Sequence, residues 1–265
     1  MPLPPLEHVV YGPVQSRRLG RSLGVNLLPA GMKICNMDCA YCQYGWTSSR
    51  PSRSARAGSW PRPADVERAV AARLDIAARR NELIDRITVA GHGEPTLHPA
   101  FDDIAERLCR VRDTAAPRML LSVLSNSTTA AWPDVRRGLS RFDERYMKLD
   151  AGDPFTYAQI NGSGTSLTDV VDALSQLPQI VVQAMFVADP QGRVDNTGVG
   201  AVCEWLAALE RIQPEAVHVY TIDRTPALGG LRPVDPHRLK EIAGQVHAAG
   251  FHAEVFPART GTCSA

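Results

Sequence analysis

Apolar residues recur along this chain in two alternating patterns. Between residues 64 and 80 they return at helical spacing, whereas Arg86–Ala90 is a short β-branched run typical of a strand. The same alternation continues to residue 256. We therefore expect helices at Ala64–Arg80, Phe101–Arg112, Pro133–Leu139, Leu167–Leu177, Thr197–Ile212 and Pro236–Ala249, and strands at Leu23–Leu28, Arg86–Ala90, Met119–Leu124, Tyr146–Leu149, Ile180–Val187, Ala216–Ile222 and Phe251–Phe256.

This alternation predicts an α/β fold, in which a parallel sheet is covered on its outside by helices that form right-handed crossovers. A chain of 265 residues with 44% hydrophobic content can form one large domain. We expect a single domain over residues 1–265, with a lead-in at 1–22, a mobile loop rich in Arg, Ser and Pro at 47–63, and a tail at 257–265. The chemistry of such folds lies at the carboxyl ends of the strands.

Charge and targeting signals narrow the setting. The formal net charge of +1 gives no global field that would attract nucleic acid or a membrane. The first residues, MPLPPLEHVV, lack a basic stretch followed by an apolar one, and no apolar run approaches the roughly 18 residues of a membrane span. We therefore expect a cytoplasmic protein. Its six cysteines are then ligands, core residues or reactive thiols rather than disulfides.

Three of these cysteines are crowded into the segment GMKICNMDCAYCQYGW. Cys35, Cys39 and Cys42 have the spacing C-x3-C-x2-C, which lets one loop wrap one metal centre. Iron–sulfur clusters normally use four cysteines, so three would leave one iron of a four-iron cluster open to a small molecule. The alternative is a structural zinc site that borrows His92 or His98, although the second cysteine pair usual in such sites is not present.

This spacing, with Tyr41 directly before the third cysteine, resembles the cluster loop of the radical S-adenosylmethionine (SAM) superfamily. The preceding run GPVQSRRLGRSLGVN is similar to the branch that includes the tRNA 4-demethylwyosine synthases. The resemblance implies a partial (β/α)6 barrel and a [4Fe-4S] cluster on Cys35, Cys39 and Cys42. It also implies that the open iron chelates the amine and carboxylate of SAM, with Tyr41 beside the cofactors.

A second motif follows the strand at 86–90, in the run AGHGEPTLHP. Gly91 and Gly93 would let the backbone approach a ligand closely, and Glu94 adds a carboxylate. The run resembles the superfamily's "GGE" motif with His92 replacing the second glycine, which implies that Glu94 and the backbone near Gly93 bind the SAM amine. His92 either faces the substrate as a proton-transfer group or has a capping or packing role.

Polar residues also end the next strands. Ser125 and Asn126 suit a ribose or the SAM carboxylate, although such residues also cap helices. Lys148 lies in a predicted buried strand, where a lysine suggests a carboxylate partner, either Asp150 or SAM itself. Gln183 follows the same logic in the next strand. We expect these residues to bind the cofactors.

Two further places are candidates for substrate chemistry. Asp223 and Arg224 follow the strand at 216–222 and either meet the substrate or pair with each other. Cys263 lies in the tail, which leaves the last strand on the face of the active site. Its thiol could therefore donate a hydrogen atom to a substrate radical. The alternative is a frayed terminus with an incidental cysteine. Cys109 and Cys203 lie in helical patterns and are expected to be core residues.

The resemblance implies an enzyme that cleaves SAM reductively and generates a 5′-deoxyadenosyl radical, which abstracts hydrogen from a small molecule or peptide. An electron donor such as flavodoxin or ferredoxin would supply the electron. One alternative is a tRNA-modifying enzyme of the wyosine type, which the arginines of residues 47–63 favour and the near-neutral charge opposes. The other is a non-enzymatic iron–sulfur or zinc-binding protein.

Overall fold

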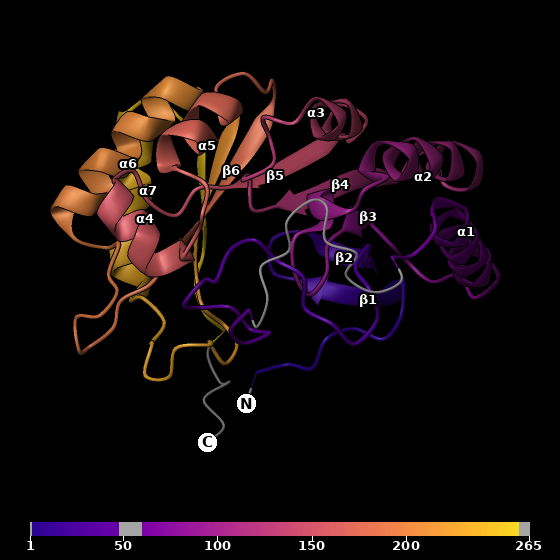
Figure 1. The fold of residues 1–265 in the computed structure, drawn as a ribbon, viewed down its shortest axis with the longest axis horizontal. Coiled ribbons are helices and arrows are strands. Elements are labelled where there is room, and N and C mark those ends of the chain that lie inside the picture. The colour runs from indigo at the N-terminus through magenta and orange to yellow at the C-terminus, as the bar shows by residue number, and fades with distance from the viewer. Residues whose placement is uncertain (1, 48–59, 260–265) are drawn as a thin grey trace. The chain divides into compact units, whose positions relative to one another are not determined.

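The computed structural model describes residues 2–47 and 60–259, in which helices and strands alternate (Figure 1). The strands are β1 (Val10–Ser16), β2 (Gly20–Val25), β3 (Arg86–Val89), β4 (Leu120–Ser125), β5 (Glu144–Lys148), β6 (Ile180–Phe186), β7 (Ala216–Thr221) and β8 (Ala253–Phe256). The helices are α1 (Pro63–Arg79), α2 (Phe101–Ala115), α3 (Pro133–Leu139), α4 (Pro154–Asn161), α5 (Leu167–Leu174), α6 (Val199–Ile212) and α7 (Pro236–Ala248), with a 3-10 turn η1 (Pro95–Leu97).

The strands follow one another in the sheet in chain order, from β1 to β8. The pairs β2–β3, β3–β4, β6–β7 and β7–β8 are parallel, whereas β1 and β2 are antiparallel. The α/β class and the parallel sheet expected from the sequence are therefore confirmed, and the antiparallel first pair is an addition to them.

Contacts divide the chain into two compact units, each described by itself. The N-terminal unit comprises Pro4–Asn36 and the described part of Ser48–Tyr146. The C-terminal unit comprises the described residues among 1–3, 37–47 and 147–265. The boundaries fall within β5 and within the cysteine loop, so Cys35 belongs to the N-terminal unit and Cys39 and Cys42 to the C-terminal unit. The single domain expected from the sequence stays a prediction.

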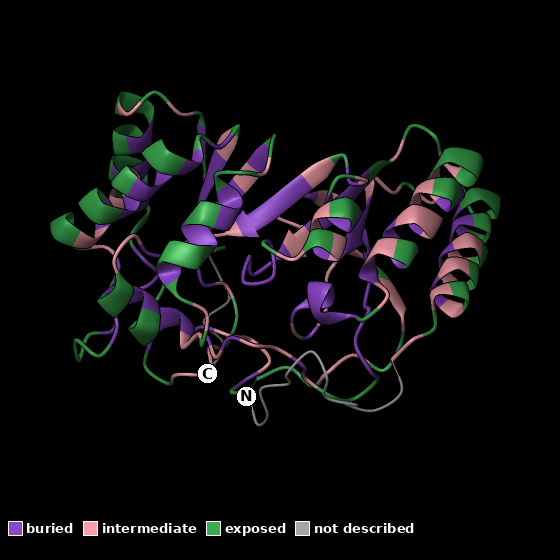
Figure 2. Cartoon of the chain, turned by 45° about the horizontal axis from the view of Figure 1, so that its top comes forward, coloured by how far each residue is buried: buried purple, intermediate pink, exposed green. Residues whose placement is uncertain are grey.

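The N-terminal unit is built on β1–β4 with α1, α2 and α3 alongside (Figure 1). Leu23, Ile87 and Leu121 lie opposite one another on neighbouring strands and are completely buried. Successive side chains of a strand point to opposite faces, so these apolar residues share one face of the sheet. The helices are buried on one side and exposed on the other (Figure 2), as their apolar spacing predicts. This apolar layer is the core of the unit.

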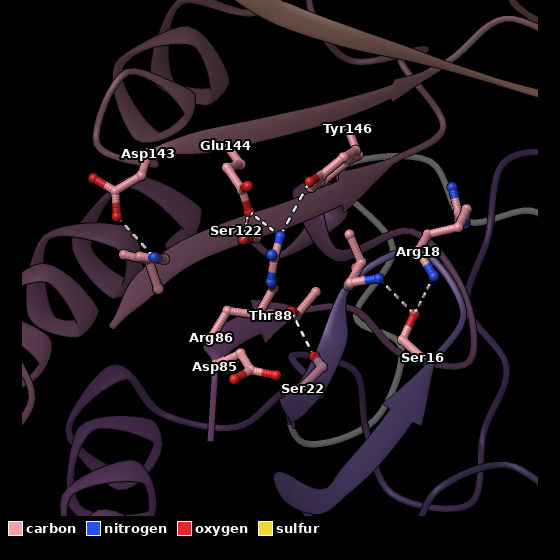
Figure 3. Close-up of polar contacts among 12 residues, drawn as sticks. Ser16, Arg18, Ser22, Asp85, Arg86, Thr88, Ser122, Asp143, Glu144 and Tyr146 are labelled. Atoms are coloured by element: carbon pink, nitrogen blue, oxygen red, sulfur yellow. Dashed lines mark hydrogen bonds and ion pairs between the residues drawn. The ribbon is translucent and has the colours of Figure 1, made fainter. Parts of the chain in front are cut away.

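Polar side chains fill the remaining positions of these strands (Figure 3). Ser22 donates a hydrogen bond of 2.6 Å to Thr88 on the neighbouring strand. Arg86 donates to the carboxylate of Glu144 and, over 3.1 Å, to the hydroxyl of Tyr146. Burial, followed by the charge of Glu144, raises the pKa of Tyr146 to about 12. The polar face is therefore internally hydrogen-bonded near the amino ends of β3 and β5.

The C-terminal unit packs α5, α6 and α7 with the parallel strands β6, β7 and β8 (Figure 1). Its core includes Trp205 of α6, which is 5.1 Å from the ring of Phe186 in an edge-on contact. The indole N–H of Trp205 donates a 2.9 Å hydrogen bond to the carbonyl of Leu149, directly after β5. This bond fixes the residues that lead from β5 to the candidate site.

Three elements differ most from the sequence expectation. The first strand expected at Leu23–Leu28 lies at Gly20–Val25, and the lead-in contains β1, which was not predicted. Gly12-Pro13 and a register irregularity between Tyr11 and Val14 interrupt the alternation by which β1 could have been recognised. Helix α4 was also missed. It spans only eight residues, although Asp153 caps it and Gly162 ends it in the left-handed conformation.

Among the described residues, no helix is both long enough and apolar enough to cross a membrane. The cytoplasmic location expected from the sequence stays a prediction.

Candidate functional site

The C-terminal half of the cysteine loop is fixed to the end of α4. The backbone N–H of Asp38 donates to the carbonyl of Asn161, and that of Ala40 donates to the carbonyl of Ile160, each over 2.8 Å. Between these bonds stands Cys39, which is buried. One backbone hydrogen bond on each side of Cys39 therefore fixes its position.

The sulfur of Cys39 faces two nitrogen donors. The ammonium of Lys148, the last residue of β5, lies 3.6 Å from it, and the side-chain amide of Asn161 lies 3.5 Å from it. The same ammonium is 4.9 Å from the centre of the Tyr41 ring. Lys148 thus lies beside a cysteine sulfur and an aromatic face, and the carboxylate partner expected for it stays a prediction. Its role in cofactor binding stays a prediction.

Asp150 lies behind these residues and is 1% exposed. Its carboxylate accepts hydrogen bonds from the hydroxyl of Tyr41, from the amide of Asn161 at 2.7 Å and from the backbone N–H of Met185 at 2.8 Å. Burial, and next the charge of Asp150, raise the pKa of Tyr41 well above its ordinary value. Asp150 therefore connects the cysteine loop, α4 and β6 through one buried carboxylate.

Asn161 was given no role in the site from the sequence, although it belongs to the run that resembles the family. It is completely buried, and its amide nitrogen serves both Cys39 and Asp150. The oxygen of its side-chain amide is buried without a hydrogen-bond partner among the described residues. A buried unpaired acceptor is costly, so this oxygen is a group that the N–H of a bound ligand can satisfy. The available signal was its place eleven residues after Asp150 in the run Leu149-Asp150-Ala151, at the end of a helix that was missed.

The other candidates of the C-terminal unit have separate environments. Gln183 is buried in β6 opposite His218 of β7. Asp223 accepts a 2.8 Å hydrogen bond from the backbone N–H of Arg259, whereas Arg224 donates a 2.9 Å hydrogen bond to the side chain of Gln43, in the cysteine loop. The structure thus gives Asp223 and Arg224 different partners. Their contact with substrate stays a prediction.

Cys35 begins the cysteine loop in the N-terminal unit. The side-chain amide of Asn126, directly after β4, is 3.6 Å from its sulfur and donates a 2.8 Å hydrogen bond to the side-chain oxygen of Asn36. Asn36 in turn donates a 2.6 Å hydrogen bond to the hydroxyl of Thr128. Asn126, one of the two residues expected to end β4 as cofactor ligands, is therefore placed beside a predicted cluster ligand.

Glu94 fixes this end of β4 and is 1% exposed. Its carboxylate accepts hydrogen bonds from the backbone N–H and hydroxyl of Thr96, the hydroxyl of Ser125 and the backbone N–H of Asn126. Burial raises the pKa of Glu94, while these donors oppose the rise. In this structure the carboxylate accepts hydrogen bonds from the protein's own donors. Its contact with the SAM amine stays a prediction.

The two glycines of this motif bring the chain close to itself. A Cβ at Gly93 would lie 1.8 Å from the carbonyl oxygen of Ile34, and one at Gly91 would lie 2.2 Å from the side-chain oxygen of Asn26. The backbone N–H of Glu94 donates to that same Ile34 carbonyl over 2.9 Å. The glycines therefore let the turn after β3 pack against the residue preceding Cys35, and their contact with a ligand stays a prediction.

His92 has both ring nitrogens engaged inside the N-terminal unit. Nδ1 accepts from the backbone N–H of Leu6 at 2.9 Å, and Nε2 lies 3.0 Å from the carbonyl of Pro29. Burial lowers the pKa of His92, so the ring is neutral near pH 7. These contacts favour the packing alternative over proton transfer to a substrate.

The zinc alternative can be weighed against these surroundings. His98 also uses both ring nitrogens, toward Pro61 and Ala100, and burial lowers its pKa to about 4. Among residues 2–47 and 60–259, no group of three or more His, Cys, Asp or Glu is gathered for a single metal ion. A zinc ion requires such convergence, whereas each cysteine of a four-iron cluster binds a different iron. The engaged ring nitrogens of His92 and His98 therefore speak against these histidines as zinc ligands.

Three remaining predictions concern cysteines and the loop. Cys263 lies outside the described residues, as do Arg50, Arg53 and Arg56 of the arginine-rich loop. Cys203 is exposed on α6, so its assignment to the core was wrong: its position falls on the solvent side of the helix. Cys109 is half-buried, and its thiol donates to the carbonyl of Arg141.

Comparison with known proteins gives one family match and several relatives. The model for the Radical SAM superfamily matches residues 31–182. A UPF0026 protein of Synechocystis is 31% identical over 217 residues, which cover 79% of this chain and 74% of that protein. A UPF0026 protein of Methanocaldococcus jannaschii is 36% identical over 153 residues. That match covers 58% of this chain and less than half, 44%, of the relative.

Solved structures share the fold at low sequence identity. A radical SAM methyltransferase from Sphaerobacter thermophilus has a TM-score of 0.62 and 13% identity, over 89% of this chain and 65% of that one. TYW1 with a lysine-pyruvate adduct bound has a TM-score of 0.61 and 15% identity, over 86% and 73% of the two chains. SuiB of Streptococcus suis bound to SAM has a TM-score of 0.60 and 10% identity, over 85% and 48%.

Proposed function

The chain belongs to the radical SAM superfamily, and we propose that Cys35, Cys39 and Cys42 ligate its [4Fe-4S] cluster. Family membership confirms the resemblance seen in the sequence, and the shared fold confirms the partial barrel. The protein is accordingly an enzyme of this class, and its cofactors are a [4Fe-4S] cluster and SAM.

One observation carries the ligand assignment. Two of the three sulfurs face N–H donors: Cys35 faces Asn126, and Cys39 faces Lys148 and Asn161. Donors of this kind stabilise thiolates, which are the form of cysteine that binds iron. Cys42 completes the spacing, and its backbone N–H donates to the carbonyl of Cys39 over 3.0 Å. The donor pattern therefore supports this loop as the cluster site.

When bound, the reduced cluster and SAM together supply a 5′-deoxyadenosyl radical, which we propose abstracts hydrogen from the substrate. The protein's part is to position these groups and to exclude water. Asp150 holds Tyr41 and Asn161, and Glu94 holds Ser125 and Asn126. We assign both carboxylates to positioning. The buried side-chain amide oxygen of Asn161 is available to a ligand N–H.

For the substrate we propose a small molecule or a peptide, with flavodoxin or ferredoxin as the electron donor. The net charge of +1 supports this choice, because polyanionic RNA is normally bound through clustered positive charge. RNA that co-purifies with the protein and resists removal by salt would favour the tRNA alternative instead.

The test is anaerobic reconstitution with iron and sulfide, followed by SAM and dithionite. The protein should bind about four irons per chain and release 5′-deoxyadenosine. Cys39→Ala should lose both properties, whereas Cys203→Ala, which removes an exposed cysteine, should keep them. Four bound irons without 5′-deoxyadenosine would contradict the enzymatic proposal and leave an iron–sulfur binding protein.

A further inference from the structure

The geometry points to a specific task for Lys148 and Asn161: they raise the reduction potential of the cluster by acting on the sulfur of Cys39. This inference rests on the proposed function, because it takes Cys39 as a cluster ligand. It gives Lys148 a role toward the cluster itself.

Lys148 carries the charge of this pair. Its ammonium is 3.6 Å from the sulfur and 4.9 Å from the centre of the Tyr41 ring. The negative face of an aromatic ring attracts a cation, and Tyr41 is itself held by Asp150 through its hydroxyl. A flexible lysine side chain is therefore directed to the sulfur by a ring that belongs to the cysteine loop.

Asn161 adds a second donor whose orientation is determined by its neighbours. Its amide nitrogen lies 2.7 Å from a carboxylate oxygen of Asp150 and 3.5 Å from the sulfur of Cys39. A flipped amide would turn its oxygen toward a carboxylate and a sulfur, both of which are acceptors. The N–H of Asn161 therefore faces the sulfur, and the loop bonds to α4 keep the two residues together.

Reduction adds one negative charge to a cluster. A nearby cation and N–H donors to a ligand sulfur stabilise the reduced form more than the oxidised form, which raises the reduction potential. Lys148 is only partly exposed, so water screens its charge less than at a free surface. Because the electron must reach the cluster from a donor protein, a higher potential makes that step easier.

The experiment compares reconstituted holoproteins by redox titration followed with electron paramagnetic resonance. Lys148→Gln keeps a polar side chain of similar length and removes the charge, whereas Lys148→Arg retains the charge. Lys240→Gln removes the same charge from an exposed position on α7 and is the matched control. Iron per chain is measured for each variant, so a shift is compared only among proteins with equal cluster content.

We expect Lys148→Gln to weaken the one-electron reduction equilibrium about tenfold, a shift of about 59 mV toward more negative potential. Lys148→Arg and Lys240→Gln should stay close to the wild-type potential. An unchanged potential in Lys148→Gln at full iron content overturns the inference and leaves the proposed function standing.

A variant that loses the cluster requires a different measurement. If Lys148→Gln binds no iron, Asn161→Ala decides, since a negative shift in that variant supports the inference and an unchanged potential overturns it. A wild-type protein that binds no iron after reconstitution instead overturns the proposed function.

Discussion

The surroundings of Cys35 and Cys39 follow the same plan with different charge. In the N-terminal unit, the neutral amide of Asn126 faces the sulfur of Cys35, and the buried carboxylate of Glu94 holds the backbone of Asn126. In the C-terminal unit, the amide of Asn161 and a cation face the sulfur of Cys39, and the buried carboxylate of Asp150 holds Asn161. Both thiols thus have a nitrogen donor fixed by a carboxylate.

The difference separates two tasks. A buried carboxylate that accepts several N–H and O–H donors fixes geometry, and each unit has one. The ammonium of Lys148 adds a positive charge beside the sulfur of Cys39, whereas a neutral donor would be enough to orient that sulfur. We therefore expect changes at the carboxylates to act mainly on stability, and changes at the sulfur donors to act mainly on the cluster.

The largest effect is expected from Asp150→Ala. Three donors lose their acceptor in a buried site, namely the Tyr41 hydroxyl, the Asn161 amide and the Met185 backbone N–H. Since each buried unsatisfied group costs about 1–3 kcal/mol, we expect the free energy of unfolding to fall by about 3–5 kcal/mol. Urea unfolding measures it. Asp75→Ala, at an exposed helix position, is the control, and equal losses in both variants would contradict the role of Asp150.

Glu94→Ala should cost less, about 2–3 kcal/mol in the same measurement. The reason is that two of its donors are hydroxyls, which can rotate, and that of Thr96 already lies beside the hydroxyl of Thr129. If Glu94 instead acts mainly on the SAM amine, the variant would unfold like wild type and bind SAM more weakly. Calorimetry with SAM on the reconstituted protein therefore separates the two roles.

Gly93→Ala tests how closely the turn after β3 packs beside Cys35. The added Cβ would meet the backbone carbonyl of Ile34 at 1.8 Å, so the turn or the cysteine loop must move. Forced repacking of this kind costs about 1–3 kcal/mol. Gly164→Ala is the control, because in the described part of the chain no heavy atom beyond Gly164 and its two chain neighbours lies within 4 Å of the added Cβ. Equal unfolding midpoints for the two variants would show that the turn yields without cost.

Asn126→Leu tests the neutral donor at Cys35. Removing one uncharged N–H donor should lower the cluster potential by less than Lys148→Gln does, because a neutral donor stabilises added charge less than a cation. Redox titration of the two variants side by side measures the difference. A larger shift in Asn126→Leu would reverse the comparison between the two cysteines.

A surface pair gives the smallest effect and a baseline. Hydrogen bonds from Arg21 lower the pKa of Asp85 from 3.8 to about 2. The carboxylate is thus favoured in the folded state, so its contribution is present above pH 3.8 and is lost as the pH falls toward 2. Both side chains are more than a third exposed, and we expect Asp85→Asn to cost only about 0.5 kcal/mol at pH 7. That cost should vanish in unfolding measurements near pH 2.

The sequence predicted the parts of this picture that depend on local pattern. The spacing of Cys35, Cys39 and Cys42 and the alternation of helices and strands are visible in the residues themselves. Contacts between residues that are distant in the sequence could not be predicted from local pattern. A glycine such as Gly93 signals that something approaches closely, and the structure shows that it is the chain's own carbonyl at Ile34.

Lys148 and Asn161 illustrate the same limit of pattern. An inward lysine predicts a carboxylate partner, but the sulfur beside Lys148 depends on which loop packs next to β5. Asn161 serves Cys39, which lies 122 residues earlier in the chain, from the end of a short helix that periodicity did not reveal. Pairs so distant in sequence are set by tertiary packing.

The electron paramagnetic resonance spectrum of the reconstituted, reduced protein, recorded with and without SAM, shows whether SAM binds at an open iron of the cluster. Three cysteine ligands leave one iron open, so we predict about four irons per chain and a spectrum that changes when SAM is added. A spectrum that SAM leaves unchanged, or an iron count near zero or near eight, would contradict this prediction.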